Sequence, residues 1–280
     1  MNPNIYTLLC KRDLEMAKIT LPKIIQFLSQ DQKLIVIDDG SFSEENAHEV
    51  RSISPKITVI LRSQREQLIT TILSKHPNCL RYRESFPLAF KLLDVPLLAM
   101  NESPRFIFTD GDILYLKKCE AYFQRKENTY LITDGIKLSF TLRDGLFKYK
   151  WKIPLQFNSG YFSYHTDEFD LDFIEYYLGL PDVRKINWLS EQSCWALLFG
   201  RSKKRIDCPD INQFICRNPY KGPDETTFAI HLIGLKDKVV DWQDPVYKSG
   251  YEENDPIFNQ ARNVGKMDWI KKQFQRHISL

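Results

Sequence analysis

The sequence lacks three features that would assign it to a class at once: paired cysteines, long hydrophobic runs and a strong net charge. Six cysteines occur in 280 residues, but none forms a Cys-x-x-Cys pair and their spacing matches no zinc motif. No apolar run is long enough to span a bilayer, and the first one, at residues 5–10, lacks the basic start of a secretory leader. The net charge of +3 suits anionic ligands and does not require nucleic acid. We therefore expect a cytoplasmic globular protein with reduced thiols.

The start of the chain has the pattern of a strand–helix–strand unit. Apolar runs rich in β-forming residues at 4–10 and 33–41 predict two strands. Between them, residues 13–30 carry apolar side chains at helical spacing, and Pro22 predicts a kink or a late helix start. Strand, helix and strand within about forty residues are typical of a parallel βαβ unit.

The same alternation continues to about residue 112 and then becomes mixed. Residues 56–62 and 105–112 predict two more strands, and residues 86–100 are apolar enough for a buried helix. In the second half we expect strands at 129–135, 138–154 and 157–165, and helices at 169–180 and 190–200. This order predicts a single α/β domain with a central, mostly parallel sheet flanked by helices.

Two aspartates end the apolar run at 106–109. Asp110 and Asp112 flank Gly111 directly after this predicted buried strand. Burying two like charges is costly, so a divalent cation, a cationic side chain or exposure to water should compensate for them. Two carboxylates one residue apart at the carboxyl end of a strand can share a hard cation through their oxygens. The alternative is an ordinary exposed Asp-Gly turn.

An earlier strand ends in the same way. Asp38 and Asp39 precede Gly40 and Ser41, so their carboxylates should reach the same edge of the sheet and could accept hydrogen bonds from a base or a ribose. The alternative is a turn or an N-cap for the next helix, where Asp, Gly and Ser are all favoured.

One histidine lies in an apolar run near the end of the pattern. His231 is followed by Gly234, Lys236 and Lys238, which place a turn and two cations just after the imidazole. A diphosphate site would use this combination. The alternative is a histidine that is buried in the core with its hydrogen bonds satisfied.

Taken in order, these motifs resemble those of glycosyltransferases with the GT-A fold. They are the first strand, the Asp-Asp-Gly-Ser turn, the Asp-Gly-Asp motif, the Asn-x-Gly at 158–160 and the His-x-x-Gly at 231–234. The resemblance covers residues 4–242 and is greatest to the retaining group that includes glycogenin and the bacterial lipopolysaccharide galactosyltransferases. It implies a Rossmann-like sheet and transfer of a sugar from a nucleotide donor, a UDP-sugar, to a glycan, lipid-linked or protein acceptor.

The resemblance also implies roles for single residues. A manganese or magnesium ion would be held by Asp110, Asp112 and His231 and would bridge the diphosphate. The remaining donor contacts would be Thr7 and Leu8 at the base, Asp38 or Asp39 at the uracil or ribose, Lys91 near the phosphates, and Asn158 and Gly160 at the sugar. Glu191 and Gln192 take the place of an Asp-Gln pair that faces the donor sugar.

Two departures from the family pattern concern the mechanism. The family signature His-x-x-Gly-x-x-Lys-Pro-Trp is replaced by "HLIGLKDKV", in which the lysine is shifted and Pro-Trp is missing. The Asp-Asp-Gly-Ser turn is more typical of inverting enzymes. The closer resemblance implies retention of configuration, with Glu191 on the sugar hydroxyls and Gln192 near the anomeric carbon.

Two other functions stay open from the sequence. The run "IFTDGDI" also resembles the motif of phosphohydrolases that use an aspartyl nucleophile, although that motif normally lies near the N-terminus. A domain that binds nucleotide sugars without catalysis is the other alternative.

Two basic segments complete the picture. The run at 200–208 is interpreted as a solvated loop, with an acceptor or phosphate surface as the alternative and no nucleic-acid signature beside it. We divide the chain into a GT-A domain at 1–245 and an extension at 246–280. The extension carries a basic amphipathic helix with Met267, Ile270, Phe274 and Ile278 on one face, which would dock on the domain or contact an anionic membrane surface.

Overall fold

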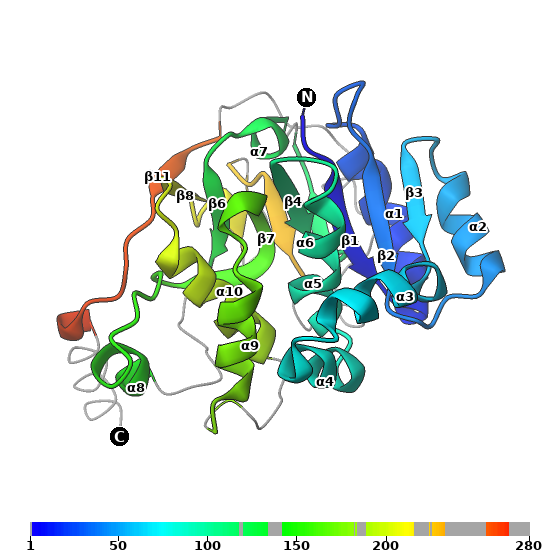
Figure 1. Cartoon of the computed structure of the whole chain (residues 1–280). Helices are drawn as coiled ribbons and strands as arrows, with labels where there is room; N and C mark the ends of the chain where they lie inside the picture. Colours follow the sequence, from blue (N-terminus) through cyan, green and yellow to red (C-terminus); the bar gives the residue numbers. More distant parts are fainter. Residues whose placement is uncertain are drawn as a thin grey trace, which may run out of the picture.

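An eight-stranded mixed β-sheet runs through the protein, with helices on both of its faces (Figure 1). The computed structural model describes residues 2–117, 120–133, 142–181, 183, 189–215, 224, 226–232 and 256–268. The strand order in the large sheet is β11-β8-β6-β7-β4-β1-β2-β3. A second sheet has the order β5-β10-β9.

The first half of the chain builds the parallel part of the large sheet. Its strands are β1 (Ile5–Leu9), β2 (Leu34–Asp38), β3 (Ile57–Ile60) and β4 (Arg105–Thr109). β1 pairs in parallel with β2 and with β4, and β2 pairs in parallel with β3. The predicted βαβ start and the predicted strand before Asp110 are therefore confirmed.

The second half of the chain adds strands of both directions. They are β6 (Asn128–Ile132), β7 (Phe157–His165), β8 (Ile206–Pro209) and β11 (Phe258–Gln260). β7 runs antiparallel to β4 and β6, β8 runs parallel to β6, and β11 runs antiparallel to β8. The small sheet consists of β5 (Ile113–Tyr115), β9 (Phe214–Ile215) and β10 (Ala229–His231).

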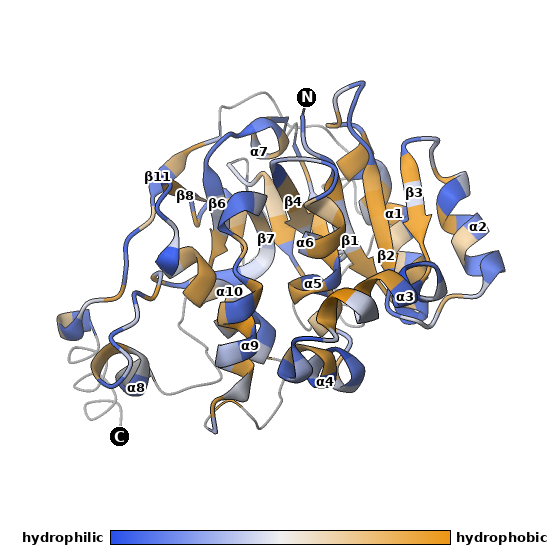
Figure 2. Ribbon diagram, in the orientation of Figure 1, coloured by the Kyte–Doolittle hydropathy of each residue, from blue (hydrophilic) through white to orange (hydrophobic). Residues whose placement is uncertain are grey.

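Helices cover both faces because neighbouring strand residues point to opposite sides of the sheet. Tyr6 and Phe106 belong to one hydrophobic cluster, whereas their neighbours Ile5 and Ile107 belong to the other. The first cluster contains residues of α3 (Arg62–Leu73), α4 (Pro77–Ser85), α5 (Ala89–Leu92), α6 (Asp94–Ala99), α9 (Leu171–Gly179) and α10 (Leu189–Arg201). The second contains residues of α1 (Leu14–Ile25), α2 (Glu44–Ser52) and α7 (Glu120–Gln124). Figure 2 shows the hydrophobic strands between these layers, with α2 hydrophilic on its outer side.

Proline affects two of the predicted helices. α1 begins at Leu14 and keeps Pro22 inside it, so the predicted late start is wrong. The predicted helix at 86–100 is instead two short helices, α5 and α6, which meet at Leu93. Pro96 lacks the N–H that would bond to the carbonyl of Leu92, so one continuous helix would lose a hydrogen bond there.

The predicted strand at 138–154 is wrong where the structure describes this segment, because α8 (Leu142–Phe147) lies in it. The alternation of aromatic residues and lysines after α8 has the period of a strand, but the backbone does not stay extended. Lys150 has a φ of 54°, in the left-handed region, and the rings of Tyr149 and Trp151 stack 4.4 Å apart.

The last described segment joins the edge of the large sheet. β11 pairs with β8, and the Val264 amide donates to the carbonyl of Ile153. The predicted domain boundary at 245/246 and the predicted amphipathic helix after residue 268 lie outside the described residues, and Met267 is exposed. Among the described helices, none has the length and apolar character needed to cross a membrane.

The described cysteines, Cys10, Cys79, Cys194 and Cys208, are free thiols.

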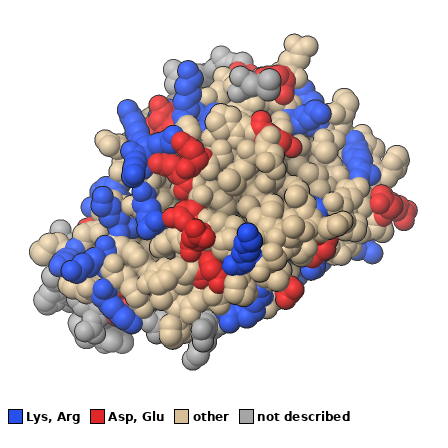
Figure 3. Space-filling view, in the orientation of Figure 1, with Lys and Arg blue, Asp and Glu red and all other residues tan. Residues whose placement is uncertain are grey.

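The basic run at 200–208 is only partly a solvated loop. Residues 201–205 lie at the surface, but Ile206 begins β8 and Cys208 is buried. Figure 3 shows that Lys and Arg side chains gather on the side of the molecule where β8, β11 and α8 lie.

Candidate functional site

Three of the predicted site residues lie at one edge of the large sheet. Because β1 to β4 are parallel, their carboxyl ends share this edge; Asp38 ends β2 and Asp110 directly follows β4. β7 runs the other way, so its second residue, Asn158, lies at the same edge. The amide of Asp110 donates to the carbonyl of Gly160, which fixes the start of β7 beside the end of β4. This edge is where ligands bind in open α/β sheets.

Asp110, Asp112 and His231 form a compact cluster at this edge. One ligand atom from each lies within 4.8 Å of the others. His231 Nε2 is 3.4 Å from an oxygen of Asp110 and 3.2 Å from an oxygen of Asp112. Antiparallel pairing of β10 with β5 brings the histidine there, since His231 lies opposite Ile113. Two carboxylates and an imidazole are a donor set that could hold a divalent metal ion, and three protein ligands leave coordination positions open.

Two glycines allow this cluster to be so compact. A Cβ atom on Gly160 would lie 2.3 Å from Cε1 of His231, so only glycine permits the imidazole to pack on β7. A Cβ atom on Gly111 would lie 2.4 Å from a methyl group of Leu9. Glycine at position 111 therefore lets the turn after β4 pack against β1.

Lys91 enters the site from α5 and is almost fully buried. Its Nζ lies 3.0 Å from an oxygen of Asp110 and 3.8 Å from an oxygen of Glu191. The same Nζ is 4.7 Å from the centre of the Phe108 ring. A buried ammonium group is tolerated here because two carboxylates face it. Asp110 is therefore paired with the ammonium group of Lys91, and Nε2 of His231 lies beside its other oxygen.

Glu191 and Gln192 lie in the first turn of α10, beside Asn158 on β7. Ser159 links them: its hydroxyl donates to Glu191 at 3.0 Å, and its amide N lies 3.5 Å from Oε1 of Gln192. Burial raises the pKa of Glu191 to about 7; Lys91 opposes this shift and the charge of Asp110 adds to it. Glu191 is thus a carboxyl group able to exchange a proton near neutral pH.

A cavity of about 370 Å³ opens beside the cluster. Its lining residues come from the ends of β1, β2 and β4 and from the chain before α5: Leu8, Leu9, Cys10, Arg12, Asp13, Asp39, Phe86, Pro87, Leu88, Asp110, Gly111 and Asp112. From the predicted set it therefore brings together Leu8, Asp39, Asp110 and Asp112. Arg12 and residues 86–88 also line the cavity but were not predicted from the sequence. Their only sequence signal is their position, directly after the first strand for Arg12 and directly before α5 for residues 86–88.

Thr7 and Asp38 do not line this cavity. Thr7 is fully buried in β1, and its hydroxyl has no hydrogen-bond partner among the described residues. The Asp38 carboxylate accepts hydrogen bonds from the amides of Gly40, Phe42 and Arg62. Asp38 thus organises the loop after β2, which is the turn role that the sequence left open.

Gly234, Lys236 and Lys238 lie outside the described residues, so their predicted phosphate contacts stay predictions.

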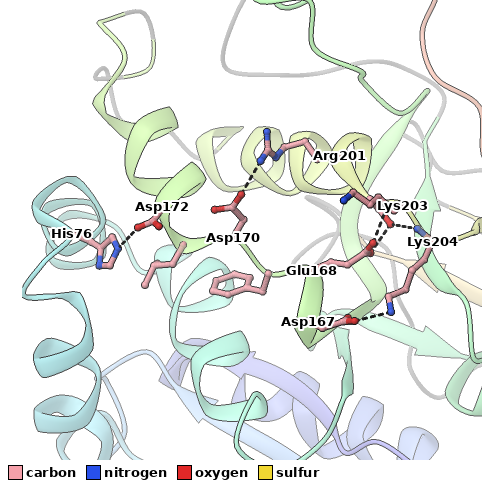
Figure 4. Close-up of a pocket in the computed structure, with 11 residues that line it drawn as sticks. His76, Asp167, Glu168, Asp170, Asp172, Arg201, Lys203 and Lys204 are labelled. Atoms are coloured by element: carbon pink, nitrogen blue, oxygen red, sulfur yellow. Dashed lines mark hydrogen bonds and ion pairs between the residues drawn. The ribbon is translucent and has the colours of Figure 1, made fainter.

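A second, larger cavity of about 740 Å³ lies between α9, the end of α10 and the start of α4 (Figure 4). Its charged side chains pair with one another: Arg201 with Asp170 at 2.8 Å, and Lys204 with Asp167 at 2.9 Å. This cavity adjoins the end of β7, opposite the edge that holds Asp110, and no predicted site residue lines it.

The comparisons with known proteins agree with the geometry. No protein-family model and no curated protein sequence matches the chain. Among solved structures, mouse xyloside xylosyltransferase 1 in its apo form aligns with a TM-score of 0.53 at 12% identity, over 82% of this chain and 97% of its own. LgtC, a galactosyltransferase solved with donor and acceptor sugar analogues, aligns with a TM-score of 0.51 at 12% identity, over 98% of this chain and 94% of its own.

An active-site mutant of LgtC aligns with a TM-score of 0.53 at 12% identity, over 88% of this chain and 94% of its own. At such low identity these alignments establish the fold alone. The chain has the GT-A glycosyltransferase fold, as the resemblance of its motifs implied.

Proposed function

We propose that the protein is a metal-dependent glycosyltransferase that moves a sugar from a nucleoside-diphosphate donor, a UDP-sugar, to an acceptor hydroxyl. The observation that carries this proposal is the Asp110–Asp112–His231 cluster at the cavity edge of a GT-A fold. An exposed Asp-Gly turn would not explain why a buried histidine and a buried lysine face the two carboxylates.

In this proposal, different residues contact the leaving diphosphate, the nucleoside and the sugar. Asp110, Asp112 and His231 would hold manganese or magnesium, which neutralises the charge that develops on a leaving diphosphate. Lys91 supplies a second positive charge beside Asp110. Leu8 and Asp39 would contact the base and ribose from the cavity wall. Glu191 and Gln192 would face the sugar, together with Asn158 at the start of β7.

The proposal includes retention of configuration. In a retaining reaction the leaving diphosphate can accept the acceptor proton, so no separate general base is required. Glu191 would then hold sugar hydroxyls, and Gln192 would lie near the anomeric carbon. NMR of the first-formed product from an α-linked donor tests this: an α-linked product supports retention, whereas a β-linked product makes Glu191 the candidate base.

A thermal-shift panel tests the binding part of the proposal. UDP, GDP, ADP and CDP are each added with and without manganese, because a ligand that binds only the folded state stabilises it by about 3 kcal/mol at a hundred times its Kd. We expect UDP to raise the Tm only when manganese is present. Asp112→Asn should lose this metal-dependent shift.

A second assay separates the alternatives. Hydrolysis of p-nitrophenyl phosphate without release of UDP from any UDP-sugar would favour the phosphohydrolase function. UDP binding without release of UDP from a panel of UDP-galactose, UDP-glucose and UDP-xylose, even with sugar acceptors, would favour a non-catalytic binding domain.

A further inference from the structure

Asp94 lies at the centre of a buried ion cluster that borders the proposed site without lining its cavity. Its side chain is fully buried and accepts hydrogen bonds from two arginines. Arg65 Nε donates to one carboxylate oxygen at 2.7 Å, and Arg83 Nε donates to the other at 2.8 Å. Arg83 also pairs with Glu66 at 2.8 Å.

This cluster surrounds the side chain that precedes Lys91. The guanidinium carbons of Arg62, Arg65 and Arg83 lie 5.2, 5.0 and 5.1 Å from the centre of the Phe90 ring. Each is within the range of a cation–π contact. Phe90 is fully enclosed, and the next residue in the chain is Lys91.

The same cluster also holds the loops at the end of the sheet. Arg65 donates to the carbonyl of Asp38 at 2.7 Å and to the carbonyl of Ile60 at 3.2 Å. These carbonyls belong to the last residues of β2 and β3. The cluster thus joins two strand ends to α5, and the loop that follows Asp38 contributes Asp39 to the cavity.

Stability alone is a weak explanation for such a cluster. Buried ion pairs often contribute little net stability, since desolvation offsets their attraction. α5, in contrast, has only four residues, which is too short to hold a side chain in place without outside contacts. Lys91 Nζ must nevertheless stay between two carboxylates in a nearly buried position.

We propose that Asp94 is a positioning residue for Lys91. By holding Arg65 and Arg83 around Phe90, it keeps α5 where Lys91 Nζ reaches Asp110, and it links that lysine to the loop after β2. This inference rests on the proposed function, in which Lys91 faces the donor phosphates.

The test is a double-mutant cycle between Asp94→Asn and Lys91→Gln. The rate measured is the release of UDP from UDP-galactose, UDP-glucose or UDP-xylose with manganese, which needs no acceptor. We expect Asp94→Asn to lower kcat at least tenfold in the wild-type background and less than twofold in the Lys91→Gln background. Equal losses in both backgrounds would mean that Asp94 is merely structural and would overturn the proposal.

Asp207→Asn is the matched control. Asp207 is also a fully buried aspartate held by two arginines, Arg125 and Arg205, but it lies on β8. It should cost less than twofold in kcat in both backgrounds. If Asp94→Asn does not fold, Phe90→Leu replaces it in the cycle, because it keeps every charge of the cluster and removes only the ring.

A crystal structure of the variant decides the inference independently of catalysis. Loss of the 3.0 Å contact between Lys91 Nζ and Asp110 in Asp94→Asn or Phe90→Leu supports the positioning role. Retention of that contact overturns it. If the wild-type protein turns over none of the three UDP-sugars, the proposed reaction fails, and the crystal structure alone decides the placement of Lys91.

Discussion

The turn after β2 and the turn after β4 look alike in sequence but use their carboxylates differently. Among the described residues, the Asp38 carboxylate accepts hydrogen bonds from backbone amides alone, two in its own loop, Gly40 and Phe42, and one at the start of α3, Arg62. The pair at 110 and 112 is faced instead by side chains from distant parts of the chain, His231 on β10 and Lys91 on α5. Hydrogen bonds from backbone amides stabilise a turn, whereas an imidazole and a second carboxylate beside the first could bind a cation.

This difference separates stability from chemistry. If the Asp38 carboxylate were removed, the three amides that donate hydrogen bonds to it would lose their acceptor. Asp38 therefore supports the fold. Asp112, in contrast, lies beside the like charge of Asp110, so neutralising Asp112 removes a repulsion. We therefore expect substitution of Asp38 to lower mainly stability and substitution of Asp112 to lower mainly activity.

The largest expected effect is at the second turn. Asp112→Asn should lower manganese-dependent release of UDP by about 1000-fold, since a metal that neutralises the leaving group supplies several kcal/mol. His231→Ala should abolish the same activity. Steady-state kinetics across a manganese titration measures both.

The control for this prediction is stability. Asp112→Asn should unfold within about 1 kcal/mol of the wild type in urea, because it removes a like charge beside Asp110. Full activity of Asp112→Asn with manganese present would contradict the metal assignment.

The first turn should give the reverse result. Asp38→Ala leaves the amides of Gly40, Phe42 and Arg62 without an acceptor, and we expect it to lower the free energy of unfolding by about 3 kcal/mol. Asp38→Asn keeps one acceptor oxygen and should cost about half as much. Urea unfolding of both variants measures this difference, and an Asp38→Ala protein as stable as the wild type would refute the structural role.

The negative charge at the second turn also acts on Glu191. Its pKa is raised from an ordinary value of 4.5 to about 7, chiefly by burial and further by Asp110. Between these two values the folded state binds more protons than the unfolded state, so stability falls as the pH rises and the loss is complete above 7. The shift corresponds to a loss of up to about 3 kcal/mol.

Glu191→Gln should remove this dependence. We expect the variant to gain stability relative to the wild type as the pH rises from 4.5 to 8, measured by urea unfolding at both pH values. A difference that does not change with pH would show that Glu191 titrates normally.

The sequence predicted the edge of the sheet well, because a buried strand that ends in aspartate is visible in one short segment. Asp38 ends one buried strand, Asp110 directly follows another, and Asn158 is the second residue of a third. A single segment does not reveal which groups contact each carboxylate. The amides that reach Asp38 come from the loop at 39–42 and from the start of α3, and Lys91 meets Asp110 through the packing of α5.

The errors have the same origin. The segment after α8 alternates like a strand, but Lys150 adopts a left-handed backbone conformation that the alternation does not reveal. Asp94 shows no motif at all, because its partners lie 29 and 11 residues earlier in the chain. Contacts across such separations are set by tertiary packing, which local patterns do not specify.

The smallest expected effect is at Asp39, which shares a turn with Asp38 but lines the cavity. Its carboxylate accepts one hydrogen bond, from the amide of Ser41 at 3.0 Å, and the side chain is partly exposed. Asp39→Ala should therefore lower stability by less than about 1 kcal/mol. If Asp39 contacts the base or ribose, the same change should weaken UDP binding about tenfold, because one hydrogen bond to a charged group contributes about 1.5 kcal/mol. Calorimetric titration of UDP with manganese measures this, with urea unfolding as the control. Unchanged UDP affinity in a stable Asp39→Ala protein would show that neither aspartate of this turn contacts the donor, and Asp110 and Asp112 would then be the aspartates at this edge that act on it.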